Sequence, residues 1–286
     1  MITKDSKIGL IGLGVLGGSY AEALHEAGYT NITAVDIDEE SLDYAKEKGW
    51  IRCGSTDPSV LEDCDLTVSC LYPGVFADWI RTNGKILKPG SLLSDVTGVK
   101  RVLIGKINRY LPEGVEFISC HPMAGREFKG IHYADASRFH SANFIIVSRP
   151  DNTEEAIDTM RKLAEDMKFR TVSCLTPEEH DRMISFLSQL THVIAVSLMN
   201  VKDNTDLAAY TGDSFRDLTR IARINEDMWP ELFVLNKDYL TADIDDFIGE
   251  LQEFRKLIQE EDIEGMKDKM RQSTARRAYF DKEKQS

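Results

Sequence analysis

Short apolar runs alternate with amphipathic segments through the first part of the chain. The runs are bounded by glycine, proline or polar residues, and the segments between them carry apolar residues at helical spacing. The apolar runs lie at residues 7–11, 31–35, 66–71, 91–95, 115–120, 144–148 and 170–174. Buried strands that alternate with helices are typical of an α/β protein with a doubly wound parallel sheet.

The pattern changes after Thr176 and Pro177, which suit the N-cap and the first turn of a helix. Helical spacing then recurs over residues 179–201, 214–224, 228–247 and 247–260. We therefore expect an α/β domain over 1–174 and an all-helical domain over 175–286. The segment 179–201 is apolar on more than one face, which favours a homodimer formed through the helical domain.

The first apolar run leads directly into a glycine fingerprint, GxGxxG, at residues 12–17. Gly12 suits a tight turn, Gly14 lets a pyrophosphate approach the backbone, and Gly17 lets the following helix pack closely on the strand. The strand, the glycines and the helix occur in the order of a Rossmann-type dinucleotide-binding domain.

Asp36 ends the second apolar run, about 20 residues beyond the fingerprint. An acid there accepts hydrogen bonds from a ribose and repels a 2′-phosphate, which favours NAD over NADP; the alternative is that Asp36 only caps the helix beginning near Glu39. The candidate cofactor-binding residues are Gly12, Leu13, Gly14, Val15, Leu16, Gly17, Asp36 and Leu71.

The charge and the cysteines limit the partners and the compartment. A formal net charge of −13 repels nucleic acid and anionic membranes, so a small anionic substrate needs a local cluster of arginine or lysine. Five cysteines without a CxxC pair are typical of free thiols in a reducing compartment. We find no signal peptide and expect no run of the ~20 apolar residues that cross a membrane, so the prediction is a cytoplasmic protein.

Two histidines are candidates for chemistry. His121 follows the apolar run 115–120, at a strand end where open α/β sheets place their sites; it is either a general base or a histidine in a turn fixed by Pro122. His192 lies in an apolar helical segment, where a buried structural histidine is the common alternative to a functional one. The other four histidines, among them His180, have no context that singles them out. No metal-binding motif is present.

Three arginines recur at helical spacing in the second domain. Arg216, Arg220 and Arg223 are four and three positions apart, so we expect them to share one face of a helix. Such a stripe is often solvated surface, but a guanidinium can also hold a carboxylate through two parallel hydrogen bonds.

Several motifs together resemble those of one family. They are residues 12–19, 95–100, 121–127 (His-Pro-Met-Ala-Gly-Arg-Glu), 180–181, 190–195 and 215–222 (Phe-Arg-Asp-Leu-Thr-Arg-Ile-Ala). Over essentially its whole length the sequence resembles the prephenate and arogenate dehydrogenases of tyrosine biosynthesis. The resemblance implies NAD-dependent oxidative decarboxylation of prephenate to 4-hydroxyphenylpyruvate.

The resemblance also implies roles for single residues. His121 matches the family's catalytic histidine, which takes the proton of the ring 4-hydroxyl. Arg220 matches the arginine that binds a substrate carboxylate, and His192 matches the helix histidine that lines the same pocket. Glu127 and Asp217 match acidic residues that shape the site.

Two positions depart from the family pattern. The family often has a serine where this chain has Gly98, and its hydroxyl supports the histidine and the substrate; Thr97 is the neighbouring hydroxyl. Asp213 precedes the Phe-Arg-Asp motif and adds a negative charge that could favour arogenate, which carries an ammonium group. Arogenate dehydrogenase is therefore an alternative. A β-hydroxyacid dehydrogenase and a non-catalytic dinucleotide-binding dimer are more remote alternatives.

Overall fold

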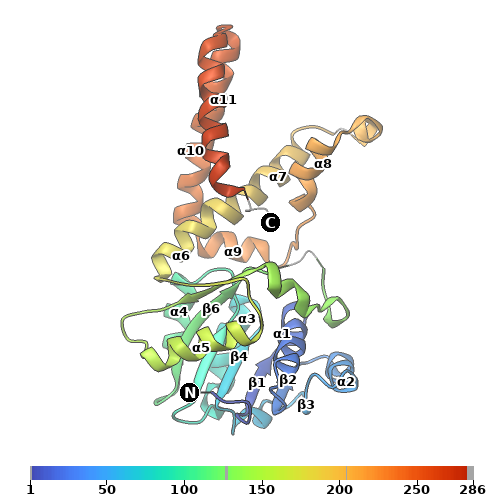
Figure 1. The fold of residues 1–286 in the computed structure, drawn as a ribbon, viewed down its shortest axis with the longest axis vertical. Coiled ribbons are helices and arrows are strands. Elements are labelled where there is room, and N and C mark those ends of the chain that lie inside the picture. The colour runs from blue at the N-terminus through green and yellow to red at the C-terminus, as the bar shows by residue number, and fades with distance from the viewer. Residues whose placement is uncertain (1, 126–127, 204, 282–286) are drawn as a thin grey trace. The chain divides into compact units, whose positions relative to one another are not determined.

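The computed structural model describes residues 2–125, 128–203 and 205–281. The chain divides into two compact units, residues 1–237 and residues 238–286. The first unit holds the sheet and the helices up to α9, and the second holds most of α10 together with α11 (Figure 1).

The first unit is built on an eight-stranded sheet with the order β3-β2-β1-β4-β5-β6-β7-β8. The strands are β1 (Ile8–Ile11), β2 (Ile32–Val35), β3 (Cys53–Ser55), β4 (Leu66–Ser69), β5 (Leu92–Asp95), β6 (Glu116–Pro122), β7 (Asn143–Val147) and β8 (Thr171–Leu175). Neighbouring strands from β3 to β6 pair in parallel, as the alternating pattern predicts. β7 is antiparallel to β6, and β8 is parallel to β7, so the sheet is parallel across six strands and reverses at the last two.

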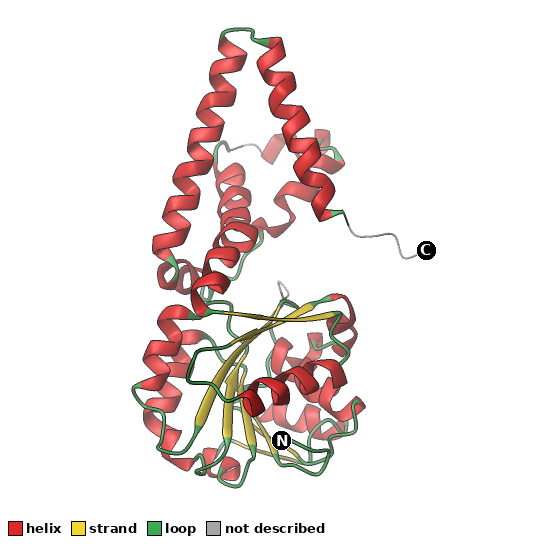
Figure 2. Cartoon of the chain, turned by 60° about the vertical axis from the view of Figure 1, so that its left-hand side comes forward, coloured by secondary structure: helices red, strands yellow, loops and turns green. Residues whose placement is uncertain are grey.

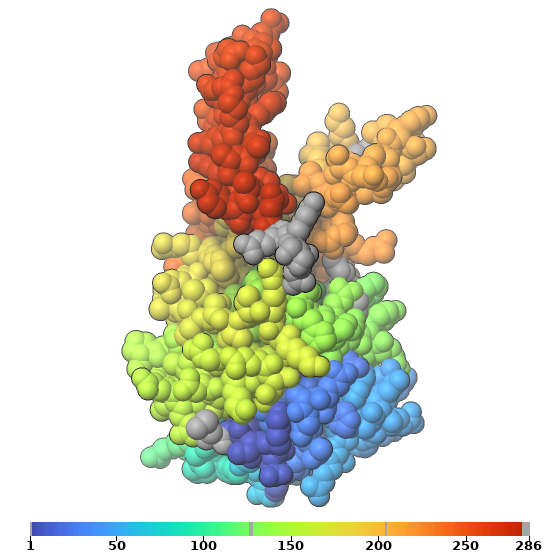
Figure 3. All heavy atoms as spheres, in the orientation of Figure 1, coloured from blue at the N-terminus to red at the C-terminus, as the bar shows by residue number. Residues whose placement is uncertain are grey.

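Helices cover both faces of this sheet, which confirms the doubly wound arrangement (Figure 2). They are α1 (Val15–Glu26), α2 (Glu39–Glu47), α3 (Pro73–Asn83), α4 (Arg101–Asn108) and α5 (Glu154–Asp166). Side chains of α1, α2 and α5 share one buried cluster with the sheet, and those of α3 and α4 share a second one. Figure 3 shows the view of Figure 1 with all heavy atoms drawn, coloured along the chain from the blue N-terminal residues to the red C-terminal ones.

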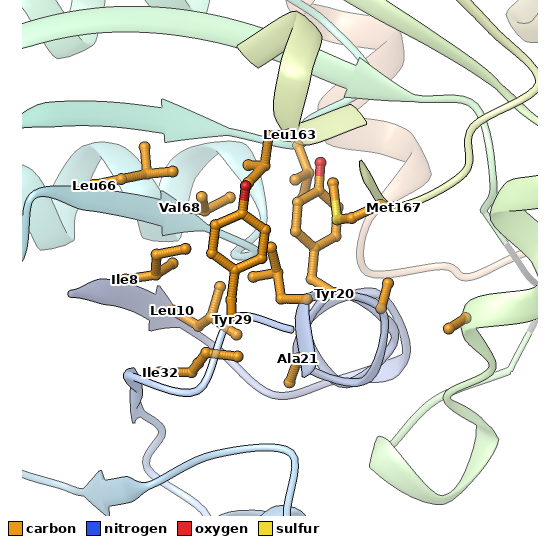
Figure 4. Close-up of a cluster of buried hydrophobic side chains, with 14 of the residues drawn as sticks. Ile8, Leu10, Tyr20, Ala21, Tyr29, Ile32, Leu66, Val68, Leu163 and Met167 are labelled. Atoms are coloured by element: carbon orange, nitrogen blue, oxygen red, sulfur yellow. The ribbon is translucent and has the colours of Figure 1, made fainter. Parts of the chain in front are cut away.

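The larger cluster shows why the apolar runs are continuous. Ile8 and Leu10 of β1 face Leu163 of α5 and the ring of Tyr20 on α1 (Figure 4). All four side chains are essentially inaccessible to solvent. A parallel strand covered on both faces has no side open to water, so apolar residues stand at consecutive positions.

The helical part of the chain differs in detail from the expected segments. Its elements are α6 (Pro177–Ile184), a π-helical turn (Ser185–Gln189), α7 (Leu190–Asn200), α8 (Asp213–Thr219), a 3₁₀ turn (Arg220–Ala222), α9 (Trp229–Leu235), α10 (Lys237–Gln259) and α11 (Ile263–Arg277). Thr176 caps α6 in a capping box with Glu179, as its position before Pro177 predicts. The break between helices falls at Asn236 rather than at residue 247, so α10 is one continuous helix.

The expected arginine stripe does not form. Arg216 lies on α8, Arg220 opens the 3₁₀ turn, and Arg223 follows in an extended conformation. The α-helix ends at Thr219, so the three side chains do not share one α-helical face.

One helix also corrects the expectation about membrane-length segments. Pro177–Asn200 contains an 18-residue window with a mean hydropathy of 1.3, so by length and composition it could cross a membrane. Only 28% of that window is buried within this chain. Apolar side chains such as Phe186 and Leu187 are about half exposed, so this helix presents an apolar surface.

A buried ion pair lies at the end of β5. Lys100 Nζ is 2.8 Å from Asp95 Oδ2, and both side chains are fully inaccessible to solvent. Lys100 Nζ also donates to the Cys120 carbonyl oxygen at 2.5 Å, and Ser119 Oγ donates to Asp95 Oδ1. The pair therefore joins the ends of β5 and β6, and removal of one partner leaves an isolated buried charge.

We expect Lys100→Met to lower the free energy of unfolding by about 3–5 kcal/mol, because Asp95 keeps its burial and loses its cation. Urea denaturation followed by tryptophan fluorescence measures the change. Lys129→Met is the matched control, since Lys129 and Asp227 form a 2.7 Å pair on the surface and such pairs contribute little. A Lys100→Met protein as stable as the wild type would contradict this role.

Candidate active site

The carboxyl ends of four adjacent strands bring the candidate residues together. β1, β4, β5 and β6 pair in register, with Ile11 opposite Ser69, Ser69 opposite Asp95, and Asp95 opposite Ser119. The glycine fingerprint, Leu71, Thr97 with Gly98, and His121 follow these positions in the chain. All of them therefore gather at the edge where open α/β sheets bind ligands.

The fingerprint has the geometry that a dinucleotide requires. Gly12 has φ +90°, a left-handed conformation that favours glycine, and a Cβ on Gly17 would lie 1.9 Å from the Gly12 carbonyl oxygen. A Cβ on Gly14 would meet nothing within 4 Å, so open space lies beside the start of α1. A pyrophosphate placed there faces the N-terminus of α1, where backbone amides and the helix dipole favour an anion.

Asp36 lies beside this loop. Its Oδ2 accepts a hydrogen bond from the Leu13 amide at 2.5 Å, and its Oδ1 accepts one from the Asp38 amide at 2.9 Å. The N-cap of α2 is Asp38, whose side chain accepts from the Glu40 amide, so the capping alternative for Asp36 is wrong. These residues fit the adenosine and pyrophosphate of NAD.

His121 lies within β6 rather than in the loop that follows it, because the strand continues through Pro122 and pairs there with β7. Its Nδ1 is 2.8 Å from Nε2 of His180. The other ring nitrogen of His180, Nδ1, is 2.8 Å from Oδ1 of Asp181. The three side chains form a row that runs from the half-buried His121 at the sheet edge to the fully buried His180 and Asp181 of α6.

Asp181 is held by the start of α4. Its Oδ1 accepts from the Lys100 amide at 2.9 Å, and its Oδ2 accepts from the Arg101 amide at 2.8 Å. Both oxygens therefore act as acceptors for backbone donors at a helix N-terminus, which suits an ionised carboxylate.

Burial keeps both imidazoles neutral. Desolvation, followed by repulsion from His180 and Lys100, places the pKa of His121 well below its usual 6.5. Desolvation also lowers the pKa of His180, but the hydrogen bond to Asp181 opposes that shift. At neutral pH His121 is thus an unprotonated imidazole with a lone pair available as a base.

The loop after β5 lies beside His121. The Thr97 hydroxyl is hydrogen-bonded to Asp95 Oδ2 and lies 3.1 Å from the Val99 carbonyl oxygen, so it is engaged within its own loop. A Cβ on Gly98 would lie 3.9 Å from Nε2 and Cε1 of His121 and 3.8 Å from Leu232 of α9. Gly98 therefore adjoins the Nε2 edge of the histidine, and a serine fits there without steric conflict.

The helical side of the site is organised by the π turn. His180 and His192 are twelve positions apart, roughly 120° around a regular α-helix at about 100° per residue. The π turn, in which the Leu190 amide bonds to the Ser185 carbonyl oxygen, absorbs about one extra residue and reduces this offset to roughly 20°. Both rings consequently project from similar sides of the long helix.

His192 packs against α9. Its Nδ1 donates to the Ser188 carbonyl oxygen at 2.8 Å, and its ring centroid lies 3.8 Å from that of Trp229. Next to it, Gln189 Nε2 donates to the Leu232 carbonyl oxygen, and Asn236 Nδ2 donates to Gln189 Oε1. The helix that carries His180 and His192 is thus fixed to α9 by buried amide hydrogen bonds.

The remaining candidates lie farther along the chain. Arg220 and Asp217 are exposed, and the turn that begins at Arg220 packs along α7, the helix of His192. Asp213 forms a 2.6 Å ion pair with Arg216, which offsets the charge that suggested a preference for an ammonium group. Glu127 lies outside the described residues.

Sequence reasoning missed His180 and gave Asp181 no role. Both residues belong to a motif of the family resemblance, but His180 is 59 positions from its partner His121 in the chain. No periodicity within α6 indicates that contact. The His-Asp pair just inside a capped helix was the available signal.

Comparison with known proteins agrees with this arrangement. Residues 20–173 match the family model "Prephenate dehydrogenase, nucleotide-binding domain", and residues 176–272 match "Prephenate dehydrogenase, dimerization domain". The chain is 27% identical to a prephenate dehydrogenase of Bacillus subtilis (92% of this chain, 72% of that protein) and 26% identical to a cyclohexadienyl dehydrogenase of Zymomonas mobilis (91% of each). A crystal structure of prephenate dehydrogenase from A. aeolicus with hydroxyphenyl propionate and NAD+ superimposes with a TM-score of 0.88, at 26% identity, over 96% of this chain and 98% of that one.

Two of the three fingerprint glycines, Gly14 and Gly17, predict different effects of substitution by alanine. We expect Gly14→Ala to leave the melting temperature nearly unchanged while it weakens dinucleotide binding, because the methyl group fills open space at the pyrophosphate position. Gly17→Ala should lower the melting temperature, because its methyl group collides with the Gly12 carbonyl oxygen. Thermal denaturation and fluorescence titration with NAD measure the two quantities; equal effects of both variants on stability would contradict this distinction.

Proposed function

The chain belongs to the prephenate dehydrogenase family, and on that premise we propose that it converts prephenate to 4-hydroxyphenylpyruvate by NAD-dependent oxidative decarboxylation. The observation that carries the proposal is the neutral, half-buried His121 at the carboxyl edge of the sheet, next to a fingerprint that fits NAD. We propose a domain boundary between residues 174 and 175. With this boundary, the cofactor site and His121 both belong to the sheet domain.

NAD, when bound, supplies the acceptor for the hydride that leaves the ring carbon bearing the 4-hydroxyl. His121 takes the proton of that hydroxyl at Nε2, the ring nitrogen that faces Gly98. Carbon dioxide leaves as the ring becomes aromatic, and aromatisation drives the step. The protein therefore needs one base and a fixed orientation of the ring, and general-base catalysis of this kind contributes about 10²–10⁴-fold.

Arg220 and His192 are the proposed substrate anchors on the helical side. A guanidinium binds a carboxylate with two parallel hydrogen bonds, and prephenate carries two carboxylates. The packing of the Arg220 turn along α7 supports placing the two residues at one pocket. Gly98 leaves room for the substrate hydroxyl beside His121, and Thr97, Glu127 and Asp217 complete the proposed surroundings.

Two features favour prephenate and NAD over their close analogues. The Asp213–Arg216 ion pair removes the main argument for an arogenate preference. Asp36 lies at the fingerprint with both oxygens turned to backbone amides, and its negative charge there repels the 2′-phosphate of NADP.

We also propose a homodimer formed through the helices. In the second unit, α10 and α11 diverge from the turn that joins them (Figure 2). Within the described part of that unit, Leu240 is the one buried residue of α10, and α11 has none. Apolar residues such as Leu251 and Ile258 are more than half exposed. A second copy that covers these residues and the apolar surface of Pro177–Asn200 accounts for both without a membrane.

The proposed location is the cytoplasm. All five cysteines are free thiols, and Cys64 and Cys120 are buried in the sheet domain. Thiols that remain reduced are typical of a reducing compartment.

Spectrophotometry at the NADH absorbance band tests the activity. We expect cofactor reduction with prephenate and NAD, with kcat/KM lower by on the order of tenfold or more when arogenate or NADP is substituted. Faster turnover of arogenate would reverse the assignment of the substrate. Absence of reduction with both substrates would refute the proposed function.

A His121→Asn variant tests the base. Turnover should fall about 10²–10⁴-fold while NAD affinity stays the same, because the amide keeps the polarity but cannot take the proton. In the wild type, kcat/KM should be flat through neutral pH and fall only well below pH 6.5, since protonation of the low-pKa imidazole removes the base. The exposed His140 provides the control variant His140→Asn; equal turnover in both variants would remove His121 from the reaction.

A further inference from the structure

The hydrogen bonds that link Asp181, His180 and His121 all have their donors and acceptors determined by Asp181, the end of the row held by backbone amides. The Lys100 and Arg101 amides can only donate, so both oxygens of Asp181 are acceptors. Nδ1 of His180 must then donate to Asp181 Oδ1. A neutral His180 is left with a lone pair on Nε2, and that lone pair must accept the proton on Nδ1 of His121. A neutral His121 consequently carries its own lone pair on Nε2.

This tautomer is the one that the reaction needs. Nε2 of His121 faces Gly98 at the sheet edge, whereas Nδ1 faces the buried His180. With the opposite tautomer, Nε2 would carry a proton and could not accept one from the substrate. Among the described residues, His180 is the side chain that is hydrogen-bonded to His121, so the tautomer depends on it.

We propose that His180, oriented by Asp181, is a positioning residue that holds His121 in the tautomer with a basic Nε2 and shares the positive charge formed on proton transfer. The proposal rests on the proposed function. When Nε2 takes the substrate proton, His121 becomes an imidazolium whose Nδ1–H points at Nε2 of His180. No further bond needs to break, and the charge is stabilised through His180 by the Asp181 carboxylate.

The surrounding charges make such support necessary. His180 is faced by His121 from β6, by Asp181 from its own helix, and by Lys100 and Asp95 from the loop and strand of β5. Lys100 opposes a positive charge on His121, and burial removes the water that would otherwise solvate it. Asp95 is already paired with Lys100, so Asp181 is the carboxylate that is hydrogen-bonded to His180 and, through it, linked to His121.

The tautomer can be measured without turnover. The experiment is to label the histidines with ¹⁵N and to record long-range proton–nitrogen correlation spectra of the cofactor-free protein at neutral pH. The signals of His121 are assigned by their loss in the variant His121→Asn. Nδ1 of His121 should be protonated and Nε2 should carry no proton, the opposite of the tautomer that predominates for a free histidine side chain in water. A proton on Nε2 of neutral His121 would overturn the proposal.

Two substitutions of His180 distinguish its role as hydrogen-bond acceptor for His121 from its role in sharing the positive charge. In His180→Gln the amide oxygen can still accept from His121, so the tautomer should persist while kcat falls roughly 10–100-fold. In His180→Phe no acceptor remains, so the tautomer should be lost and kcat should fall about 10²–10⁴-fold. KM for prephenate should change little in His180→Gln, because His180 is fully buried behind His121.

A purely structural role predicts a different result. It would lower the melting temperature of both variants, but it would leave the His121 tautomer and the acid limb of the pH profile as in the wild type. If, in addition, kcat of both variants stays within about twofold of the wild type, the proposal is overturned. If the wild type reduces no cofactor with prephenate or arogenate, the proposed function fails by itself. The nitrogen spectra still decide whether His180 sets the tautomer of His121.

Discussion

The contact between Asp181 and the first turn of α4 is the constraint on which the site depends. Asp181 is on α6, and the amides that bind it follow the loop after β5. One carboxylate thus satisfies two backbone donors that a helix N-terminus otherwise leaves unpaired, and it places α6 directly above the end of the sheet. His180 is the preceding residue, so the same contact brings its ring to His121.

The buried Lys100–Asp95 pair makes that constraint rigid. Lys100 supplies one of the two amides from its backbone, while its side chain is tied to Asp95 and to the Cys120 carbonyl oxygen. Cys120 immediately precedes His121, so the ends of β5 and β6 and the start of α4 share one network. A buried pair of this kind is a weak source of stability compared with apolar packing, and its value here is that it fixes positions.

The parts of the structure that depend on local pattern could be predicted from the sequence. Continuous apolar runs predicted seven of the eight strands, and the fingerprint with Asp36 predicted the cofactor loop, because glycine conformations and strand burial are properties of neighbouring residues. β3 (Cys53–Ser55) was missed, because it is short and has no apolar run. The reversal at β7 could not be predicted in this way, since an apolar run has no direction. The extension of β6 through His121 depends on pairing with β7, and the π turn depends on packing against α9. His180 was missed for the same reason: its role comes from a partner that is 59 positions away in the chain.

The hydrogen bond between His121 and His180 suggests a physical reason for glycine at position 98. A hydroxyl at this position could donate to Nε2 of His121, and the substrate hydroxyl would have to displace that hydrogen bond before its proton could be taken. Here the ring is supported from the opposite side, at Nδ1, so Nε2 can be held in place without a competing donor from residue 98. The support comes from the interior of the site, where burial strengthens a hydrogen bond and also makes its loss more severe. In this chain the orientation of the base therefore depends on the docking of α6 against the sheet, which is the contact made by Asp181.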